Sequence, residues 1–226
     1  MLPAQTFFYS ALGGILPSFI WLLFWLREDK LHPEPKKMIL LSFLTGMLSV
    51  LFVLYIESYI KTIFSGVIMI VLWATTEEIF KFGAAYVSAL RTKAFDEPID
   101  AMVYLITAAL GFSALENTLF LLTPINSSDI FDSVNTANLR FVGASLLHIL
   151  TSGIIGAFIA FAFYKSKKIK RGYLAIGVIL GITLHAFFNL FIIKDDGVFT
   201  FFVFCAVWTA IVILFLVFEK VKRITR

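Results

Sequence analysis

The sequence predicts an all-α membrane protein, a polytopic bundle of about seven spanning helices. Of its 226 residues, 60% are hydrophobic and only 15% are charged, and the mean hydropathy is +0.92. This composition is too apolar for an ordinary soluble domain. Apolar stretches of the roughly 20 residues that a helix needs to cross a bilayer recur along the whole chain. We therefore expect residues 1–226 to form one integral-membrane domain.

Seven stretches meet this length, and short connections separate them. The first lacks a basic leader and a small-residue cleavage site, which favours a retained helix over a signal peptide. Prolines in the turns at Glu34-Pro35 and Glu97-Pro98 end the preceding helices. The last stretch contains the lone Cys205, which we expect to be buried. The predicted spans are Ala4–Leu26, Met38–Ile60, Ile63–Leu90, Ile99–Thr123, Asn138–Tyr164, Tyr173–Ile193 and Val198–Glu219.

The connections alternate in basic charge. Lysine and arginine number 0, 4, 1, 2, 1, 5, 1 and 4 in the successive connections, where the fifth number is Arg140, two residues inside the predicted fifth span. Because basic loops stay in the cytoplasm, the N-terminus is predicted outside and the C-terminus inside. The net charge of +4 is then a signal for orientation and for anionic lipid. We expect the lipid bilayer, and no nucleic acid, as its partner.

The third span contains adjacent carboxylates, Glu77 and Glu78, and its only other charge is Lys81. An ionised side chain in hydrocarbon costs roughly 3 kcal/mol or more, so such a doublet indicates chemistry, an ion path or a tight internal partner. Helical spacing lets Lys81 reach either glutamate. The structural alternative is a buried ion pair that fixes the register of the helix.

The fourth and fifth spans add further polar groups. Glu116 and Asn117 follow Ser113 by one turn, and we weigh for Glu116 a role in the site against a role in orienting a histidine across a helix interface. His148 lies on a stripe of small and polar residues, which predicts that it faces other helices. A membrane histidine is as often a packed hydrogen-bonding residue as a functional one.

The sixth span places Gly177, Gly181, His185 and Asn189 on one helix face, since they are spaced by four. The glycines allow a neighbouring helix to approach, while His185 and Asn189 offer hydrogen-bond donors suited to a developing oxyanion. At 1.5 Å per residue, Glu77, His148 and His185 lie about 12–20 Å from the outer ends of their helices. This shared depth predicts one polar cavity in which a carboxylate activates water.

In their order and spacing, these motifs resemble the PrsW family of intramembrane proteases, which is similar to the CAAX prenyl endoproteases and the bacteriocin-immunity proteins. The resemblance covers most of the chain. It departs from the family at Ala101 and Leu105, where glycines are common, and at Asn189, where aspartate is frequent. The matching motifs are Glu77-Glu78-x-x-Lys81, Phe95-Asp96 with Asp100, Gly111-Phe112-x-x-Leu115-Glu116-Asn117, His148 and His185.

The resemblance implies site-1 cleavage of a membrane-anchored anti-sigma factor, a single-span protein, in the bacterial plasma membrane under envelope stress. Carried over by position, Glu77 is the general base and His148 orients the water. Glu78 and Lys81 hold that carboxylate. His185 and Asn189 polarise the scissile carbonyl, and Glu116 and Asn117 support the site.

We expect no cofactor, because Lys81 would repel a cation and the chain lacks an H-E-x-x-H motif. The alternative is a zinc ion held by Glu77, His148 and His185. The alternative function is a proton- or cation-coupled transporter, in which the buried charges form a relay. A non-catalytic scaffold would leave the glutamate doublet without a reason.

Overall fold

The computed structural model describes residues 4–29, 33–126, 143–193 and 198–224, and within them the protein is all-α, as predicted. A five-residue π-helical segment, η1, continues the third helix. The elements are α1 (Ala4–Glu28), α2 (Lys36–Ile63), α3 (Gly66–Ala85), η1 (Tyr86–Leu90), α4 (Asp100–Asn126), α6 (Ser145–Phe161), α7 (Lys167–Ile193) and α8 (Val198–Val221).

Five of these helices, α1, α2, α4, α7 and α8, are long and apolar enough to cross a membrane. Helix α6 is shorter, at 17 residues, and the Asn138 at which its span was predicted to begin lies outside the described residues. The predicted start of the third span at Ile63 is wrong, because Ile63 ends α2. Gly66 then opens α3 at φ +60°, a conformation that glycine adopts without strain.

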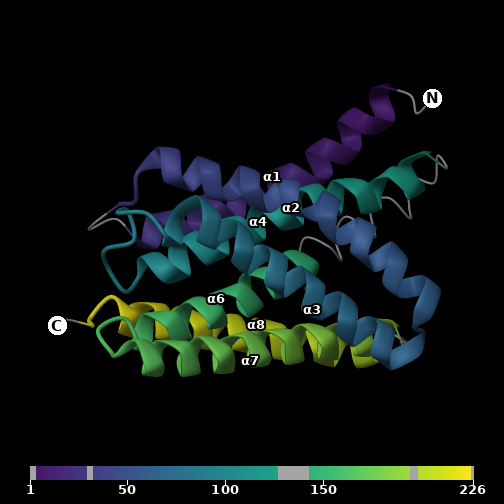
Figure 1. The fold of residues 1–226 in the computed structure, drawn as a ribbon. Coiled ribbons are helices and arrows are strands. Elements are labelled where there is room, and N and C mark those ends of the chain that lie inside the picture. The colour runs from purple at the N-terminus through teal and green to yellow at the C-terminus, as the bar shows by residue number, and fades with distance from the viewer. Residues whose placement is uncertain (1–3, 30–32, 127–142, 194–197, 225–226) are drawn as a thin grey trace.

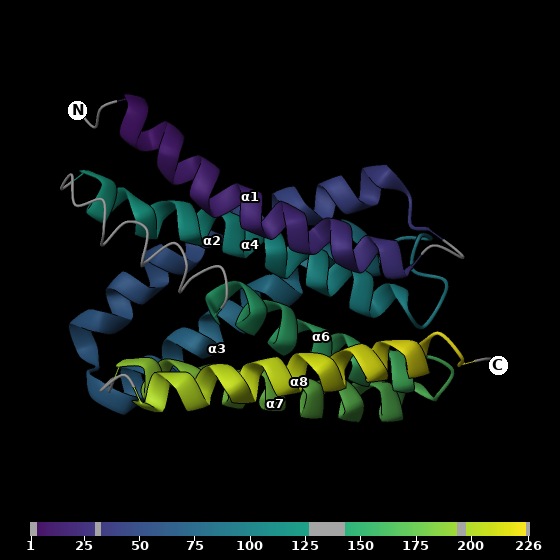
Figure 2. The ribbon, with the colours of Figure 1, turned by 180° about the vertical axis from the view of Figure 1, so that it is seen from behind.

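The long helices run roughly side by side in two groups (Figure 1). Helices α1 and α2 pack on α4, while α7 and α8 pack on α6. Helix α4 also packs on α6 and so joins the groups, and α3 crosses obliquely to contact α2, α4, α6 and α7. From behind, α1 lies across α4 and α8 lies along the outside (Figure 2). Cys205 on α8 is accordingly exposed and not buried as predicted.

Helix α4 is the centre of the bundle, since every residue from 101 to 114 is buried. A helix that is apolar on all sides is stable only when neighbours surround it. The outer helices instead expose large apolar side chains, among them Phe8, Phe52, Ile179 and Phe201. An apolar exterior of this extent suits contact with lipid chains.

Two glycines permit the crossing of α2 and α4. A Cβ atom on Gly111 would overlap the carbonyl oxygen of Phe43, and one on Gly46 would overlap that of Ala108. Small residues at such positions let helix backbones approach closely in a membrane. The crossing therefore fixes the position of α4, and with it Glu116, relative to α2.

Gly111→Ala is expected to lower stability by about 1–3 kcal/mol, because the added methyl group forces the two backbones apart. Gly83→Ala is the matched control, since a Cβ atom there meets nothing within 4 Å. The measurement is thermal unfolding of the purified variants in one detergent. Equal stability of Gly111→Ala and the parent protein would contradict the close crossing.

Polar side chains connect the start of α4 to the segment before α2, at the end of the bundle where the basic loops lie. Asp100 Oδ2 accepts hydrogen bonds from the backbone N–H groups of Asp96 at 2.9 Å and Glu97 at 2.7 Å, which fixes the turn before α4. The Tyr104 hydroxyl donates to Glu34, whose pKa is raised to about 8 by burial and by a hydrogen bond with Asp100. At 1.5 Å per residue, Asp100 lies about 24 Å along α4 from Glu116, so this group is separate from the charges of α3.

Candidate active site

Helix α3 turns its three charged side chains into the protein. Glu77 is 5% exposed, and Glu78 and Lys81 are fully buried. They face α4, α6 and α7, which pack around this part of α3. Of the three interpretations that the sequence left open for the doublet, a tight internal partner is therefore available within the described residues, and it does not exclude chemistry at the same site.

Glu78 is held by three helices at once. Its Oε1 atom accepts hydrogen bonds from Lys81 Nζ at 2.5 Å, from the Thr151 hydroxyl at 2.9 Å and from His185 Nδ1 at 2.7 Å. Spacing alone let Lys81 reach either glutamate, and the structure pairs it with Glu78. These three hydrogen bonds hold the Glu78 carboxylate in one position at the centre of the cluster.

His185 connects the two glutamates. Because its Nδ1–H donates to Glu78, its Nε2 atom carries the lone pair, and Nε2 lies 3.6 Å from Glu77 Oε2. The predicted close approach of a neighbour at Gly177 and Gly181 is confirmed. A Cβ atom on Gly181 would lie 3.2 Å from the carbonyl oxygen of Thr151 on α6, so a larger residue would push α7 away.

His148 also lies near Glu77, and it contacts two further charged side chains. Lys81 Nζ, which can only donate, lies 2.8 Å from His148 Nδ1. The ring proton therefore resides on Nε2, which donates to Glu116 Oε2 at 3.1 Å. His148 Nδ1 also lies 4.0 Å from Glu77 Oε2. Glu116 thus contacts the histidine across the α4–α6 interface, the orienting position weighed from the sequence.

Glu77 offers the reactive oxygen of the cluster. Its Oε2 atom is buried and has no hydrogen-bond partner among the described residues. The lone pair of His185 Nε2 lies 3.6 Å from it, while His148 Nδ1, which accepts from Lys81 Nζ, lies 4.0 Å from it. Two acceptors that face each other, Glu77 Oε2 and His185 Nε2, need a proton, a water or a cation between them, so this is the point at which the cluster can bind or activate a ligand.

The residues also fit a zinc ion. Glu77, His148 and His185 each offer one ligand atom, and these atoms lie within 4.8 Å of one another. A carboxylate with two imidazoles is a donor set of catalytic zinc, and a carboxylate hydrogen-bonded to the far ring nitrogen of each histidine is typical of such sites. Lys81 is neutralised by Glu78, which weakens the repulsion predicted from the sequence, but it shares the His148 Nδ1 lone pair that a metal would need.

The two asparagines differ in their surroundings. Asn117 Nδ2 donates to Ser113 Oγ at 3.0 Å and to Ser145 Oγ at 3.1 Å, and so fastens α4 to α6 one turn before His148. Asn189 lies one turn beyond His185 on α7 and is half-buried. It makes no hydrogen bond to a residue that the structure describes, so its part in the site stays a prediction.

Two neighbours of the site were given no role from the sequence. Thr151 belongs to the small and polar stripe of His148, and a hydroxyl one turn after a buried histidine is a signal for a second contact to the same partner. Phe112 packs against the His148 ring, with centroids 5.5 Å apart, and lies 5.2 Å from Lys81 Nζ. It thus covers both groups with an apolar and cation-binding face.

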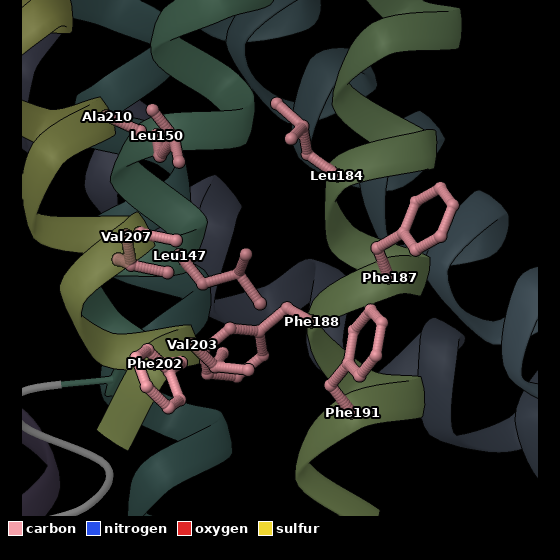
Figure 3. Close-up of a pocket in the computed structure, with 11 residues that line it drawn as sticks. Leu147, Leu150, Leu184, Phe187, Phe188, Phe191, Phe202, Val203, Val207 and Ala210 are labelled. Atoms are coloured by element: carbon pink, nitrogen blue, oxygen red, sulfur yellow. The ribbon is translucent and has the colours of Figure 1, made fainter. Parts of the chain in front are cut away.

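An apolar cavity of about 350 Å³ lies beside the cluster, between α6, α7 and α8 (Figure 3). Leu147 and Leu184, which line it, directly precede His148 and His185 in the chain. Phe188 lines it one turn after His185. Phe187 and Phe202 at its edge are exposed at 54% and 63%, so the cavity opens toward the apolar exterior.

Comparison with known proteins matches this chain to one family. The family model described as "PrsW family intramembrane metalloprotease" matches residues 34–218. Protease PrsW of Geobacillus kaustophilus HTA426 is 28% identical over 190 residues, which cover 81% of this chain and 80% of the relative. Protease PrsW of Oceanobacillus iheyensis is 30% identical, with 83% and 84% covered, and that of Bacillus subtilis 168 is 26% identical, with 78% and 79% covered. No solved structure matches the chain.

Proposed function

Because this chain belongs to the PrsW family of intramembrane proteases, we propose that it cleaves a single-span anti-sigma factor at site 1, with Glu77 as the base that activates water. The protease activity and the location in a bacterial membrane, as a multi-pass protein, follow from the family. The observation that carries the mechanism is the buried Glu77 Oε2 atom, which has no hydrogen-bond partner among the described residues and lies 3.6 Å from the His185 Nε2 lone pair.

In this mechanism a water molecule binds where Glu77 Oε2 and His185 Nε2 can both accept its protons. Glu77 takes one proton while the water oxygen attacks the scissile carbonyl carbon. The tetrahedral intermediate collapses as the C–N bond breaks, and Glu77 returns the proton to the departing amine. The second proton of the water stays on the new carboxyl group, so the products are a carboxylic acid and an amine, and the glutamate ends the cycle unchanged.

Glu78 keeps His185 in the orientation that this step needs. The hydrogen bond at 2.7 Å from Nδ1–H leaves Nε2 facing the reacting atoms, and a carboxylate in this position stabilises an imidazolium if the ring gains a proton. Only in that form can Nε2 donate to the oxyanion, as proposed for His185. Asn189, one turn further along α7, is proposed as the second donor.

A zinc ion, if bound, would be held by Glu77, His148 and His185, and would lower the pKa of its water to about 7 and polarise the carbonyl. Glu78 and Glu116 would then orient the two histidines. We propose direct activation by Glu77, since Lys81 donates to the His148 lone pair that a metal would use.

The substrate class is proposed from the family resemblance and from the surroundings of the site. The cavity beside the histidines has an apolar lining and opens to the exterior, so it suits apolar side chains of a transmembrane segment that arrives through the lipid. A single-span anti-sigma factor presents such a segment. Its soluble domain stays outside the bilayer.

The test is cleavage of single-span substrates by the purified protein in liposomes, with and without a zinc chelator. We expect cleavage within or near the transmembrane segment, at the same rate in both conditions. Loss of cleavage in chelator that is restored by zinc would overturn direct activation by Glu77. Proton flux without cleavage of any single-span substrate would overturn the proteolytic proposal.

A further inference from the structure

A second cavity, of about 250 Å³, lies at the basic end of the bundle, and its lining along α3 begins at Phe82, the residue after Lys81. The end of α3, the end of α6 and the start of α7 enclose it. Aromatic rings form much of its lining, and two cationic side chains complete it. The lining includes Phe82, Tyr86, Phe95, Phe163, Lys170 and Arg171.

The π-helical segment η1 shapes one wall. Phe82 and Tyr86 stack with ring centroids 6.0 Å apart, at an interplanar angle of 27°. Leu90, at the end of η1, lines the cavity on the same side. A π-helical turn changes which side chains share a face and is frequent at functional sites. Here it brings an extended apolar wall to the end of α3.

The cations lie where this wall meets the first turn of α7. Lys170 and Arg171 are exposed, and Lys170 Nζ lies 5.4 Å from the centroid of the Phe163 ring. A cation–π contact of this length holds the ammonium group over the cavity. Among the described residues, those that line the cavity include two cations and no acidic side chain, so an anion placed here would meet positive charge. Arg171 can bind two oxygens of one phosphate.

We propose that this cavity binds an anionic phospholipid of the leaflet at the basic end, which the loop charges predict to be cytoplasmic. Its phosphate lies between Lys170 and Arg171, and part of an acyl chain lies against Phe82, Tyr86 and Phe163. Basic pockets between transmembrane helices on this side of the membrane recognise lipid headgroups in this way. The apolar wall favours a lipid over a soluble phosphate, because a free anion would leave that wall unused.

Tyr86→Trp places a fluorescent reporter in the cavity wall, and liposomes with brominated phosphatidylglycerol or brominated phosphatidylcholine serve as quenchers. The signal of the parent protein, which has four tryptophans, is subtracted. We expect the added fluorescence to be half-quenched at an about tenfold lower mole fraction of phosphatidylglycerol than of phosphatidylcholine. Adding Lys170→Gln with Arg171→Gln should remove this preference.

The matched control is Lys167→Gln with Lys168→Gln, which removes the same charge from the same turn of α7 outside the cavity lining. The variant with both of these changes should keep most of the preference for phosphatidylglycerol. An equal loss of preference in the two double variants would mean that the lipid is attracted by general surface charge, which contradicts a specific site. Relief of quenching by millimolar glycerol phosphate would mean a soluble phosphate ligand, and equal quenching by both lipids would mean no headgroup recognition. Either outcome overturns the proposal.

Discussion

Glu77→Gln is expected to slow cleavage of a single-span substrate by about 10²–10⁴-fold, the contribution of a general base, while the protein stays folded. Glutamine has nearly the same volume, and Glu77 Oε2 makes no hydrogen bond to a described residue that the change would break. An amide cannot take a proton from water at neutral pH. The measurement is kcat and KM in liposomes, with thermal unfolding of the variant recorded in parallel.

Glu116→Gln is the matched control for this result. Its amide oxygen can still accept the hydrogen bond from His148 Nε2–H, so we expect less than a tenfold loss of kcat. If Glu116→Gln abolishes cleavage while Glu77→Gln retains it, the base is Glu116 and the assignment above is wrong. A loss in both variants with unchanged folding would mean that the two carboxylates act together.

Most of the helices could be predicted from the sequence, because local composition and length determine whether a segment forms a membrane helix. Composition and length alone require membrane-spanning helices, since unpaired backbone groups are too costly in lipid. Predicted boundaries failed where the cause is specific geometry, as at Gly66, whose positive φ starts α3 three residues after Ile63. The π-helical segment at Tyr86 to Leu90 also lacked a signal in the periodicity.

Which polar residues would meet was partly predictable. Depth along the helices brought Glu77, His148 and His185 to one level, and the structure places their ligand atoms together. The choice of Lys81 between two glutamates was not predictable, because spacing along α3 allowed both. Thr151 and His185 decide it from other helices, by converging on the same Glu78 oxygen. Family membership in turn selects the protease over the transporter that the buried charges alone left open.

Lys81→Met is expected to destabilise the protein by about 3–5 kcal/mol, because it leaves the buried Glu78 carboxylate without its charged partner. Glu78→Gln alone should cost a similar amount, since it leaves Lys81 unpaired. The two changes together are expected to cost less than their sum, because no uncompensated charge remains. The measurement is reversible unfolding in mixed micelles, with all four proteins in the same lipid and detergent.

Lys222→Met supplies the comparison at the surface. Lys222 Nζ lies 2.5 Å from Glu219 Oε1, as close as the buried pair, but both side chains are partly exposed, at 21% and 37%. A screened pair of this kind contributes about 0–1 kcal/mol. If Lys81→Met and Lys222→Met lower the free energy of unfolding by the same amount, burial does not determine how much each ion pair contributes. A full additive loss in the double variant would show that Lys81 and Glu78 stabilise the bundle independently, through His148 and Thr151.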